Sequence, residues 1–462
     1  MKRVLFIAYY FPPVGGAGVQ RSVKFVKYLP ELDYGPLVLT TRGEATGRWS
    51  PRDASLSNEV PTQVRVFRTG PVCLTKWENR WGRRLREMLG LSSQFARQWQ
   101  KAVLQTGTLI CQEERPDLIF ISMSPFEGAL AASSLARQFG IPWVADLRDP
   151  WALDEMQLHW SCFHRKLEQQ RMHVALRDAA LVIMNTPEAA DRLVRAFPDF
   201  QRKRVVHITN GFDAADFEGC KHRPDPAWFT IVHAGYLHTD IGLHLRRKRR
   251  IYEALGQVVP GVDFLTRSHY FLLQALERWL AADPGLKGKI RLILAGSLTE
   301  EDKLLVKSSG VSDIVEFTGY LSHKETVKLL INADLLFLPM HNLPPGRRAT
   351  IVPGKTYEYM AAGRPILAAV PEGDARDFVT EAGTGLVCAP DDVSAMVRIL
   401  QTQYDAWRRR HQTVALNKAF VDHFERRHLT ELLAKEFNRV LRSWAGRMVS
   451  SASNIPVPQG IR

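Results

Sequence analysis

The sequence has few cysteines, and their spacing fits neither a zinc site nor a disulfide framework. The five are scattered along the chain without a C-x-x-C pair: Cys73, Cys111, Cys162, Cys220 and Cys388. An odd, widely spaced set argues against a zinc ribbon and against a small secreted fold held by disulfides. We therefore expect a protein of a reducing compartment.

Long apolar runs are also missing. No stretch approaches the ~20 apolar residues that a membrane-spanning helix needs. The first residues, MKRVLFIAYYFPP, are basic and then apolar, as in a secretory signal. However, Pro12 and Pro13 end the apolar part, and no small-residue cleavage site follows. We interpret the segment as the first buried strand of a cytoplasmic protein.

The sequence lacks a D-x-D motif, and its 14 histidines have no ligand-like spacing, so we expect no metal and no other cofactor. The formal charge of +14 favours an anionic partner: a phosphate, an acidic lipid or nucleic acid. The basic run RRKRR (246–250) has no interleaved aromatic residues, and no nucleic-acid-binding module is recognisable. We expect no nucleic acid, and we interpret the run as a solvated loop, with a phosphate or lipid headgroup contact as the alternative.

A chain of 462 residues is too long for one ordinary core. Short apolar runs bounded by Gly, Pro or Asp alternate with helical stretches, which predicts parallel strands covered on both faces and an α/β fold. A first series comprises residues 4–10, 36–41, 117–122, 142–147, 180–185 and 205–209. A second comprises residues 230–235, 290–296, 314–319, 334–339 and 365–370.

The two series predict two Rossmann-like domains, residues 1–213 and 214–400, followed by C-terminal helices and a loose tail in residues 401–462. The segment CKHRPDP (220–226), polar and with two prolines, is typical of a linker. Two insertions, residues 70–100 and 238–266, interrupt the alternation.

A glycine-rich turn follows the first predicted strand. Gly15, Gly16 and Gly18 allow backbone N–H groups to approach a ligand, and the next helix directs its positive end at the turn. The spacing is not G-x-G-x-x-G, so a dinucleotide site has little support. The alternative is a tight turn without a ligand.

The second half contains the cluster VPGKTYEYMAAGRPILAAVPEG (352–373). Lys355 and Glu358 are three residues apart, so they share one face of the helix that follows Gly354. The lysine suits a phosphate and the glutamate suits a ribose diol. A surface ion pair between the two is the simpler alternative.

This cluster resembles the donor site of family 4 glycosyltransferases, in the branch with the pattern P-x-K-x-x-E-Y-M-A-x-G-x-P. The resemblance runs from residue 1 to about residue 440 and includes further segments in the same order: FPPVGGAG, DLRDPW (146–151), NGFDAADF (210–217), YLSHKETVKLLINADLLFLP (320–339) and EAGTGLVCAPDDVSAM (381–396). It implies the GT-B architecture, in which two Rossmann-like domains face each other across a cleft, and a retaining, metal-independent glycosyltransferase of hexosyltransferase type.

The resemblance also assigns expected roles to single residues. Carried over by position, Glu358 holds the donor's ribose and Lys355 its diphosphate, with Gly15 and Gly16 facing the phosphates across the cleft. Gly319 and Tyr320 lie where the family lines its base pocket. Asp149, in DLRDPW, falls near the reacting centre; a helix cap or turn residue is its alternative role.

Two positions depart from the family pattern. The fuller signature has a second glutamate eight residues before Glu358, where this chain has Thr350. The basic phosphate-binding residue that closely follows the first strand of the second domain is displaced by the insertion. Arg267 is the expected equivalent, because its guanidinium suits bidentate binding of a diphosphate.

The resemblance implies transfer of a sugar from a nucleoside diphosphate sugar, a UDP- or GDP-sugar, to a sugar or lipid-linked acceptor in the assembly of polysaccharide or glycolipid. The alternative is a nucleotide-binding module of the same fold without transferase activity. The segment KWENRWGRRLREMLGL (76–91) is amphipathic, with Trp and Leu on one face and Arg on the other. It predicts either a helix packed on the first domain or a peripheral contact with an anionic membrane at the inner face of the cell membrane.

Overall fold

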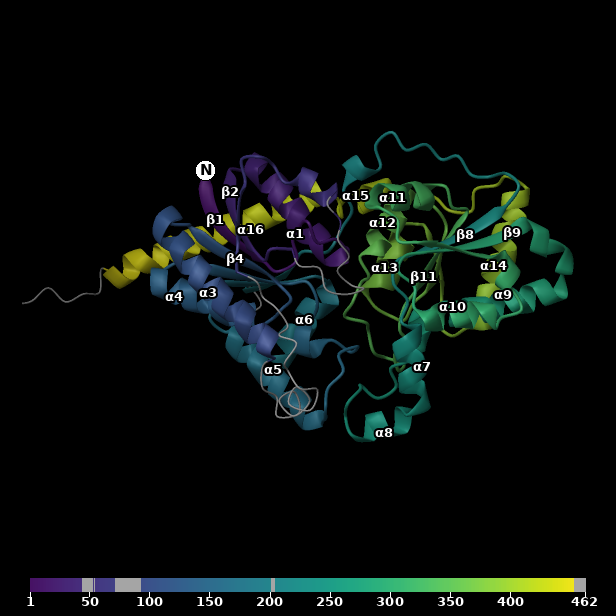
Figure 1. The fold of residues 1–462 in the computed structure, drawn as a ribbon, viewed down its shortest axis with the longest axis horizontal. Helices are drawn as coiled ribbons and strands as arrows, with labels where there is room; N and C mark the ends of the chain where they lie inside the picture. Colours follow the sequence, from purple (N-terminus) through teal and green to yellow (C-terminus); the bar gives the residue numbers. More distant parts are fainter. Residues whose placement is uncertain (44–52, 54, 71–92, 201–203, 453–462) are drawn as a thin grey trace, which may run out of the picture.

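The computed structural model describes residues 1–43, 53, 55–70, 93–200 and 204–452. It contains two parallel sheets, which lie side by side along the long axis of the molecule (Figure 1). This arrangement confirms the predicted α/β fold of two Rossmann-like halves. The amphipathic segment 76–91 lies outside the described residues, so its interpretation stays a prediction.

The first sheet has the order β3-β2-β1-β4-β5-β6-β7. Its strands are β1 (Lys2–Ala8), β2 (Tyr34–Thr40), β3 (Arg65–Arg68), β4 (Leu118–Met123), β5 (Trp143–Leu147), β6 (Leu181–Met184) and β7 (Val205–His207). This order reverses direction between β1 and β4, and such a switch point is where doubly wound sheets bind ligands.

The second sheet has the order β10-β9-β8-β11-β12-β13 and repeats the same topology. Its strands are β8 (Phe229–Ala234), β9 (Ile290–Ala295), β10 (Val315–Gly319), β11 (Leu335–Pro339), β12 (Ile366–Ala369) and β13 (Gly385–Cys388). The central strands of both sheets are buried runs of Val, Ile, Leu and Phe, because helices cover both faces.

Helices on the two faces of each sheet form four apolar cores. The first half has α1 (Ala17–Tyr28), α3 (Gln94–Glu114), α4 (Gly128–Phe139), α5 (Cys162–Leu176) and α6 (Pro187–Ala196). The second half has α9 (Tyr270–Ala282), α10 (Glu300–Lys307), α11 (His323–Ile331), α12 (Lys355–Ala362), α13 (Asp374–Glu381) and α14 (Val393–Arg408).

The insertion predicted at residues 238–266 forms two short helices, α7 (Thr239–Arg247) and α8 (Arg249–Ala254). The loop expected for RRKRR (246–250) is therefore wrong, because these residues end α7 and begin α8. Within the insertion, Leu245, Val258, Val262 and Phe264 form a small apolar core, and Leu343 of the second half and Met156 of the first half pack against it.

The C-terminal residues are helical, as expected: α15 (Lys418–Asp422) follows α14, and α16 (Arg426–Ala452) returns to the first half. Leu429, Leu433 and Phe437 of α16 pack with α1 in a core of the first sheet. The chain thus crosses between the halves twice, and the two crossings pair: Phe212 N donates to Phe424 O at 3.1 Å, and Arg426 N donates to Phe212 O at 2.8 Å.

The domain boundaries after residues 213 and 400 stay predictions, and α14 spans the second of them. Among the helices of the described ranges, none combines the length and apolar content needed to span a bilayer.

Candidate active site

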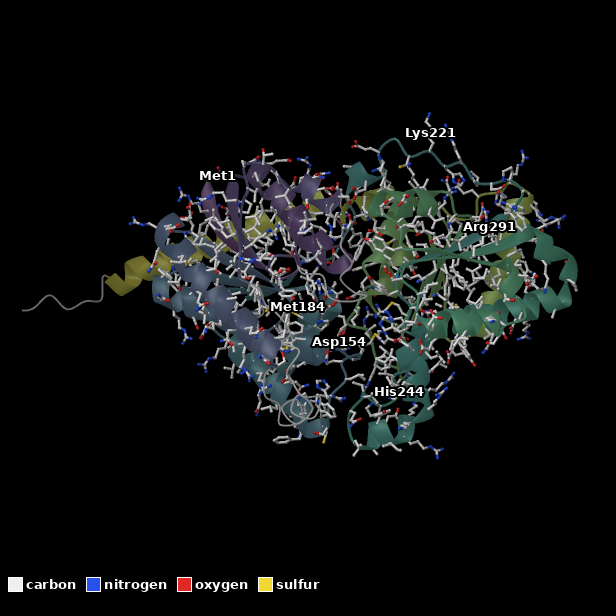
Figure 2. All side chains as sticks on the ribbon, in the orientation of Figure 1. Met1, Asp154, Met184, Lys221, His244 and Arg291 are labelled. Carbon is white, nitrogen blue, oxygen red and sulfur yellow. The ribbon has the colours of Figure 1, made fainter. Side chains whose placement is uncertain are left out.

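A cavity of about 410 Å³ lies between the two halves. It is lined by Asp149, Asp154, Met156, His238, Asp240, Ile241, Phe264, Arg267 and Ile351. Asp149 follows the carboxyl end of β5, and Figure 2 shows Asp154 at the junction of the two halves. Ligands of open α/β sheets bind beyond the carboxyl ends of the strands, so this cavity has the expected position for a substrate.

Asp149 points into this cavity from the segment that joins β5 to a short 3₁₀ helix, Trp151–Leu153. The Nε and Nη2 atoms of Arg148 lie 3.4 Å from its Oδ2. Pro150 holds the N-cap position of the 3₁₀ helix, so Asp149 is not its cap. Its side chain is 45% exposed and therefore accessible to a substrate.

The cavity contains a second carboxyl group, Asp154, which sequence reasoning missed. Burial and the neighbouring charges of Glu155 and Asp149 raise the pKa of Asp154 to about 8. The carboxyl is therefore mostly protonated at neutral pH, in which form it can donate a hydrogen bond. No local sequence pattern distinguishes this aspartate, because the raised pKa results from the folded surroundings.

Lys355 begins α12 and extends across the glycine turn that ends β8. Its Nζ lies 3.1 Å from Nε2 of His233, whose Nδ1 donates to Phe337 O at 2.9 Å. This second bond leaves Nε2 as the acceptor for the lysine. A Cβ at Gly235 would lie 3.0 Å from the lysine Nζ, so glycine leaves the room that the side chain occupies.

Burial and the positive charge of Arg267 lower the pKa of Lys355 to about 7. The charge of Arg267 therefore acts on Lys355 across the interior of the second half. Arg267 Nη1 also lies 2.9 Å from Met156 Sδ of the first half. Two cationic side chains whose charges interact in this way favour an anion between them, and a diphosphate has the required charge.

Glu358 lies one turn beyond Lys355 on α12, and its charge acts on the lysine. Its Oε1 is 3.9 Å from Nδ1 of His323, and its side chain is 22% exposed. Burial opposes the charged form of His323, but the hydrogen bond to Asp216 and the charge of Glu358 raise its pKa to about 9. Since Lys355 binds His233, the surface ion pair between Lys355 and Glu358 is not formed in the described structure.

The glycine turn lies between β1 and α1. Gly16 has φ 90° and ψ 170° at the N-cap of α1, a conformation that favours glycine. A Cβ at Gly18 would lie 2.1 Å from Nη1 of Arg148, so this guanidinium lies against the first turn of α1. Arg148 thus connects the turn of Gly15 and Gly16 to Asp149. Sequence reasoning missed it, although it lies in the quoted segment DLRDPW.

Gly319 ends β10, and Tyr320 follows it at the rim of the space between the halves. Gly319 has φ 71°, and a Cβ there would meet nothing within 4 Å. Tyr320 is 47% exposed, and its hydroxyl donates to Oδ2 of Asp53 in the first half at 3.3 Å. Of the predicted site residues, Asp149 and Arg267 line the cavity. The others are not among its lining residues: Gly15, Gly16, Gly319, Tyr320, Lys355 and Glu358.

Thr350 stands where the fuller family signature has a glutamate. It forms hydrogen bonds with Glu155 of the first half. Its backbone N donates to Oε1 of Glu155 at 2.9 Å, and its hydroxyl donates to Oε2. His341 Nε2 and Arg192 Nη1 lie 3.2 Å and 3.0 Å from the same carboxylate. Burial would raise the pKa of Glu155, but hydrogen bonds from His341 and Thr350 lower it to about 2.

An acidic cluster elsewhere encloses a lysine. Glu59, Asp213 and Asp216 lie close enough together to hold a cation. The Nζ of buried Lys24 lies 2.5 Å, 2.7 Å and 3.2 Å from them, in that order. The ammonium group of Lys24 occupies the place that a metal ion would take. The cluster is therefore a buried ion-pair network between α1 and the segment after β7.

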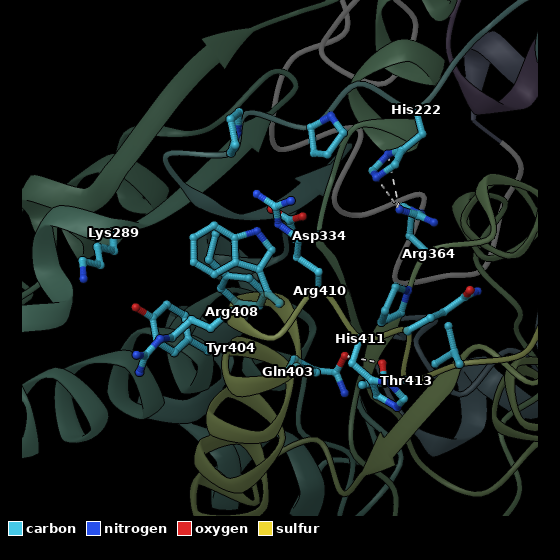
Figure 3. A pocket seen from close by; sticks show the side chains of 18 of the residues that line it. His222, Lys289, Asp334, Arg364, Gln403, Tyr404, Arg408, Arg410, His411 and Thr413 are labelled. Carbon is cyan, nitrogen blue, oxygen red and sulfur yellow. Dashed lines mark hydrogen bonds between the residues drawn. The ribbon is translucent and has the colours of Figure 1, made fainter.

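A larger cavity, of about 680 Å³, lies at the amino-terminal ends of strands of the second sheet (Figure 3). It is lined by residues that precede β11 and β12, Asp334 and Pro365, and by Tyr404 and Trp407 of α14. None of the predicted site residues lines it. Since ligands of such sheets bind at the carboxyl ends of strands, the smaller cavity is the better candidate.

Two family models match the chain. The model described as "Glycosyl transferase 4-like domain" matches residues 15–211, and the model described as "Glycosyl transferases group 1" matches residues 264–405. The first covers the glycine turn and Asp149, and the second covers Arg267, Lys355 and Glu358.

Curated relatives agree with the models. The chain is 24% identical over 410 residues to a glycogen synthase of Mycobacterium tuberculosis, covering 87% of this chain and 86% of the relative. Over 172 residues it is 28% identical to a GDP-mannose-dependent monoacylated alpha-(1-6)-phosphatidylinositol monomannoside mannosyltransferase of Corynebacterium glutamicum. That match covers 37% of this chain and 43% of the relative.

Solved structures share the fold. Sucrose-phosphate synthase from Thermosynechococcus elongatus aligns with a TM-score of 0.63 at 14% identity, covering 96% of this chain and 100% of the other. Anabaena HepE in complex with UDP and glucose aligns with a TM-score of 0.58 at 18% identity, covering 95% and 100%. With its two matched glycosyltransferase domains, its relatives and its two facing Rossmann-like sheets, the chain belongs to the glycosyltransferases of GT-B fold.

Proposed function

We propose that this protein is a retaining glycosyltransferase that transfers a sugar from a nucleoside diphosphate sugar to a lipid-linked or polysaccharide-precursor acceptor. The observation that carries the proposal is the cavity between the halves, where Asp149 of the first half faces Arg267 of the second. The charge of Arg267 also acts on Lys355, which supports a common site for the cavity and the lysine of α12.

The proposal divides the work between the halves. The second half binds the donor: Lys355 and Arg267 hold the diphosphate, Glu358 the ribose, and Gly319 with Tyr320 the base. The first half binds the acceptor, and Gly15 and Gly16 complete the phosphate site at the positive end of α1. Asp149 acts at the reacting centre, with protonated Asp154 donating a hydrogen bond beside it.

The donor is a UDP- or GDP-sugar. The structural neighbour HepE is in complex with UDP, and the mannosyltransferase relative is GDP-mannose-dependent. Calorimetric titration with UDP, GDP and other nucleotides will identify the base. Transfer from the matching sugar nucleotide, with the anomeric configuration of the product read by NMR, tests retention. Nucleotide binding without hydrolysis or transfer to any sugar or lipid-linked acceptor would favour the non-catalytic module.

We further propose that turnover needs no divalent metal, since Lys355 and Arg267 supply positive charge for the departing diphosphate. Activity should persist in excess EDTA and change less than about twofold when Mg²⁺ or Mn²⁺ is added. Loss of activity in EDTA that either metal restores would overturn this part of the proposal.

A further inference from the structure

Four large apolar side chains are exposed where α5 and α8 approach each other. They are Leu158, Phe163, Ile251 and Leu255, with exposures of 39%, 73%, 57% and 51%, and we call them the α5–α8 patch. α8 lies at the lower edge of the molecule in Figure 1, and His244 of α7 lies close to the same edge in Figure 2. Exposed apolar side chains that gather in one place mark interaction surfaces.

Hydrogen bonds between the halves hold the patch together. His159 N donates to Gln257 O at 2.8 Å, and Cys162 N donates to Leu255 O at 3.2 Å. Gly256 has φ 68°, and a Cβ there would lie 2.7 Å from backbone and side-chain atoms of Cys162. The apolar residues of the two halves therefore form one continuous surface, built by close backbone contact.

Basic residues of α5, α7 and α8 accompany these apolar side chains. Each residue from 246 to 250 is Arg or Lys, and Arg246, Arg247, Lys248 and Arg250 are exposed. Residues 244–256 contain one acidic residue, Glu253, and its carboxylate forms an ion pair with Arg249 at 2.9 Å. Exposed Lys166 adds positive charge from α5. An apolar centre with a cationic rim is complementary to a bilayer that contains anionic phospholipid.

The patch also lies next to the catalytic cavity. Met156 and Ile241 line the cavity and pack against the small core of Leu245 and Phe264. Tyr252 of α8 packs on the same core. The small core therefore contacts both the cavity lining and α8, the helix that carries Ile251.

We propose that the α5–α8 patch docks this protein on an anionic lipid bilayer and brings a lipid-linked acceptor to the cavity. The second part rests on the proposed function; the docking itself does not. Phe163, Ile251 and Leu255 insert among the acyl chains near the headgroups, and the basic residues of α7 and α8 contact the phosphates. The residues of this surface are other than those of the amphipathic segment 76–91.

Co-sedimentation with vesicles tests the docking. The wild-type protein should bind phosphatidylglycerol–phosphatidylcholine vesicles and bind pure phosphatidylcholine far less. An apolar variant, Phe163→Ser with Ile251→Ser and Leu255→Ser, should bind the anionic vesicles at least tenfold more weakly. A charge variant, Arg247→Glu with Lys248→Glu and Arg250→Glu, should lose at least as much, because each basic residue near such a surface strengthens binding about fivefold.

Matched controls come from other faces of the molecule. Leu109→Ser with Leu304→Ser removes equally exposed apolar groups, and Lys101→Glu with Lys289→Glu and Arg408→Glu makes the same charge change. Both controls should bind vesicles as the wild type does. Nucleotide binding by calorimetry should be unchanged in all variants, so a failure of the proposed function appears in a separate measurement. Wild-type vesicle binding by both patch variants would overturn the docking proposal, and would return the membrane contact to segment 76–91 if a variant there loses it.

Discussion

The ammonium group of Lys355 lies 3.1 Å from Nε2 of His233, a residue 122 positions earlier in the chain. His233 is fully buried, and its burial holds its pKa well below the usual value, so the ring is neutral and accepts the hydrogen bond. The lysine is therefore fixed in place by a partner that adds no charge. This relationship makes the protonation of Lys355 responsive to the anion that it binds.

Binding of a nucleoside diphosphate should take up a proton above neutral pH. The pKa of Lys355 is about 7 because of burial and Arg267, with Glu358 opposing, and a bound diphosphate will raise it. At pH 8 the free lysine is mostly neutral and the bound lysine charged, so affinity should fall as pH rises from 7 to 9. Calorimetry in buffers of different ionisation enthalpy measures the uptake.

Variants of Lys355 sharpen this test. Lys355→Met should weaken nucleotide binding at least tenfold and remove the proton uptake, and Lys355→Arg should remove the uptake because its guanidinium stays charged. Lys328→Met, an exposed lysine of α11, serves as the matched control and should retain both. Equal uptake by the wild type and Lys355→Met would show that another group titrates.

Replacement of Glu358 should erase discrimination between ribose and deoxyribose. Its partly buried carboxylate can accept both hydroxyls of a diol, and such charge-assisted bonds contribute about 1.5–3 kcal/mol each. Glu358→Ala should therefore bind the ribonucleotide at least tenfold more weakly, and Glu358→Gln, which keeps one acceptor, should lose less. Titrations of the ribo- and deoxyribonucleotide into each variant provide the comparison. The role is falsified if folded Glu358→Ala retains the wild-type preference.

Asp149→Asn should reduce kcat by at least a hundredfold and leave nucleotide affinity nearly unchanged. The side chain lines the cavity between the halves, so its contact with substrate is expected to strengthen in the transition state, which appears in kcat rather than in binding. Steady-state kinetics and calorimetry on the same preparation separate the two effects. An unchanged kcat, or a large loss of nucleotide affinity, would place Asp149 outside the reacting centre.

Glu155→Gln should lower the free energy of unfolding by about 1–3 kcal/mol at pH 7, since it removes the charge that Thr350, His341 and Arg192 satisfy. The folded pKa of Glu155, about 2, lies below its ordinary 4.5. The stabilisation is therefore complete above about pH 4.5 and is lost as the pH falls toward 2. Urea unfolding of both proteins at pH 7 and pH 3 should show a smaller difference at the lower pH.

Most of the fold could be predicted because central strands are continuous apolar runs. The two missed strands, β3 and β13, are edge strands of four residues each. β3 reads RVFR, with exposed arginines at both ends, so its composition resembles a polar connection. An edge strand is covered less than a central one, and its sequence therefore carries a weaker apolar signal.

Lys355 and Glu358 could be singled out from the sequence because they lie within one motif, and their roles stay predictions. Contacts were missed where the partner is distant in sequence: Glu155 and Thr350 are 195 residues apart, and Arg148 reaches the first turn of α1. The charges of RRKRR mask the helical pattern in the sequence, which therefore predicts a loop. The small apolar core that α7 and α8 pack on supplies the contacts that stabilise these two helices. Tertiary packing, not local composition, decides such positions.

The return of α16 to the first sheet has a consequence for dissecting this protein. Residues 1–213 expressed alone would expose the apolar face that Leu433 and Phe437 cover, so the first half should aggregate when produced by a single truncation. Supplying residues 426–452 as a separate or fused peptide should restore it, because the missing helix belongs to that fold although it is encoded last. The first half is therefore a suitable substrate for split-protein complementation, with α16 as the smaller fragment.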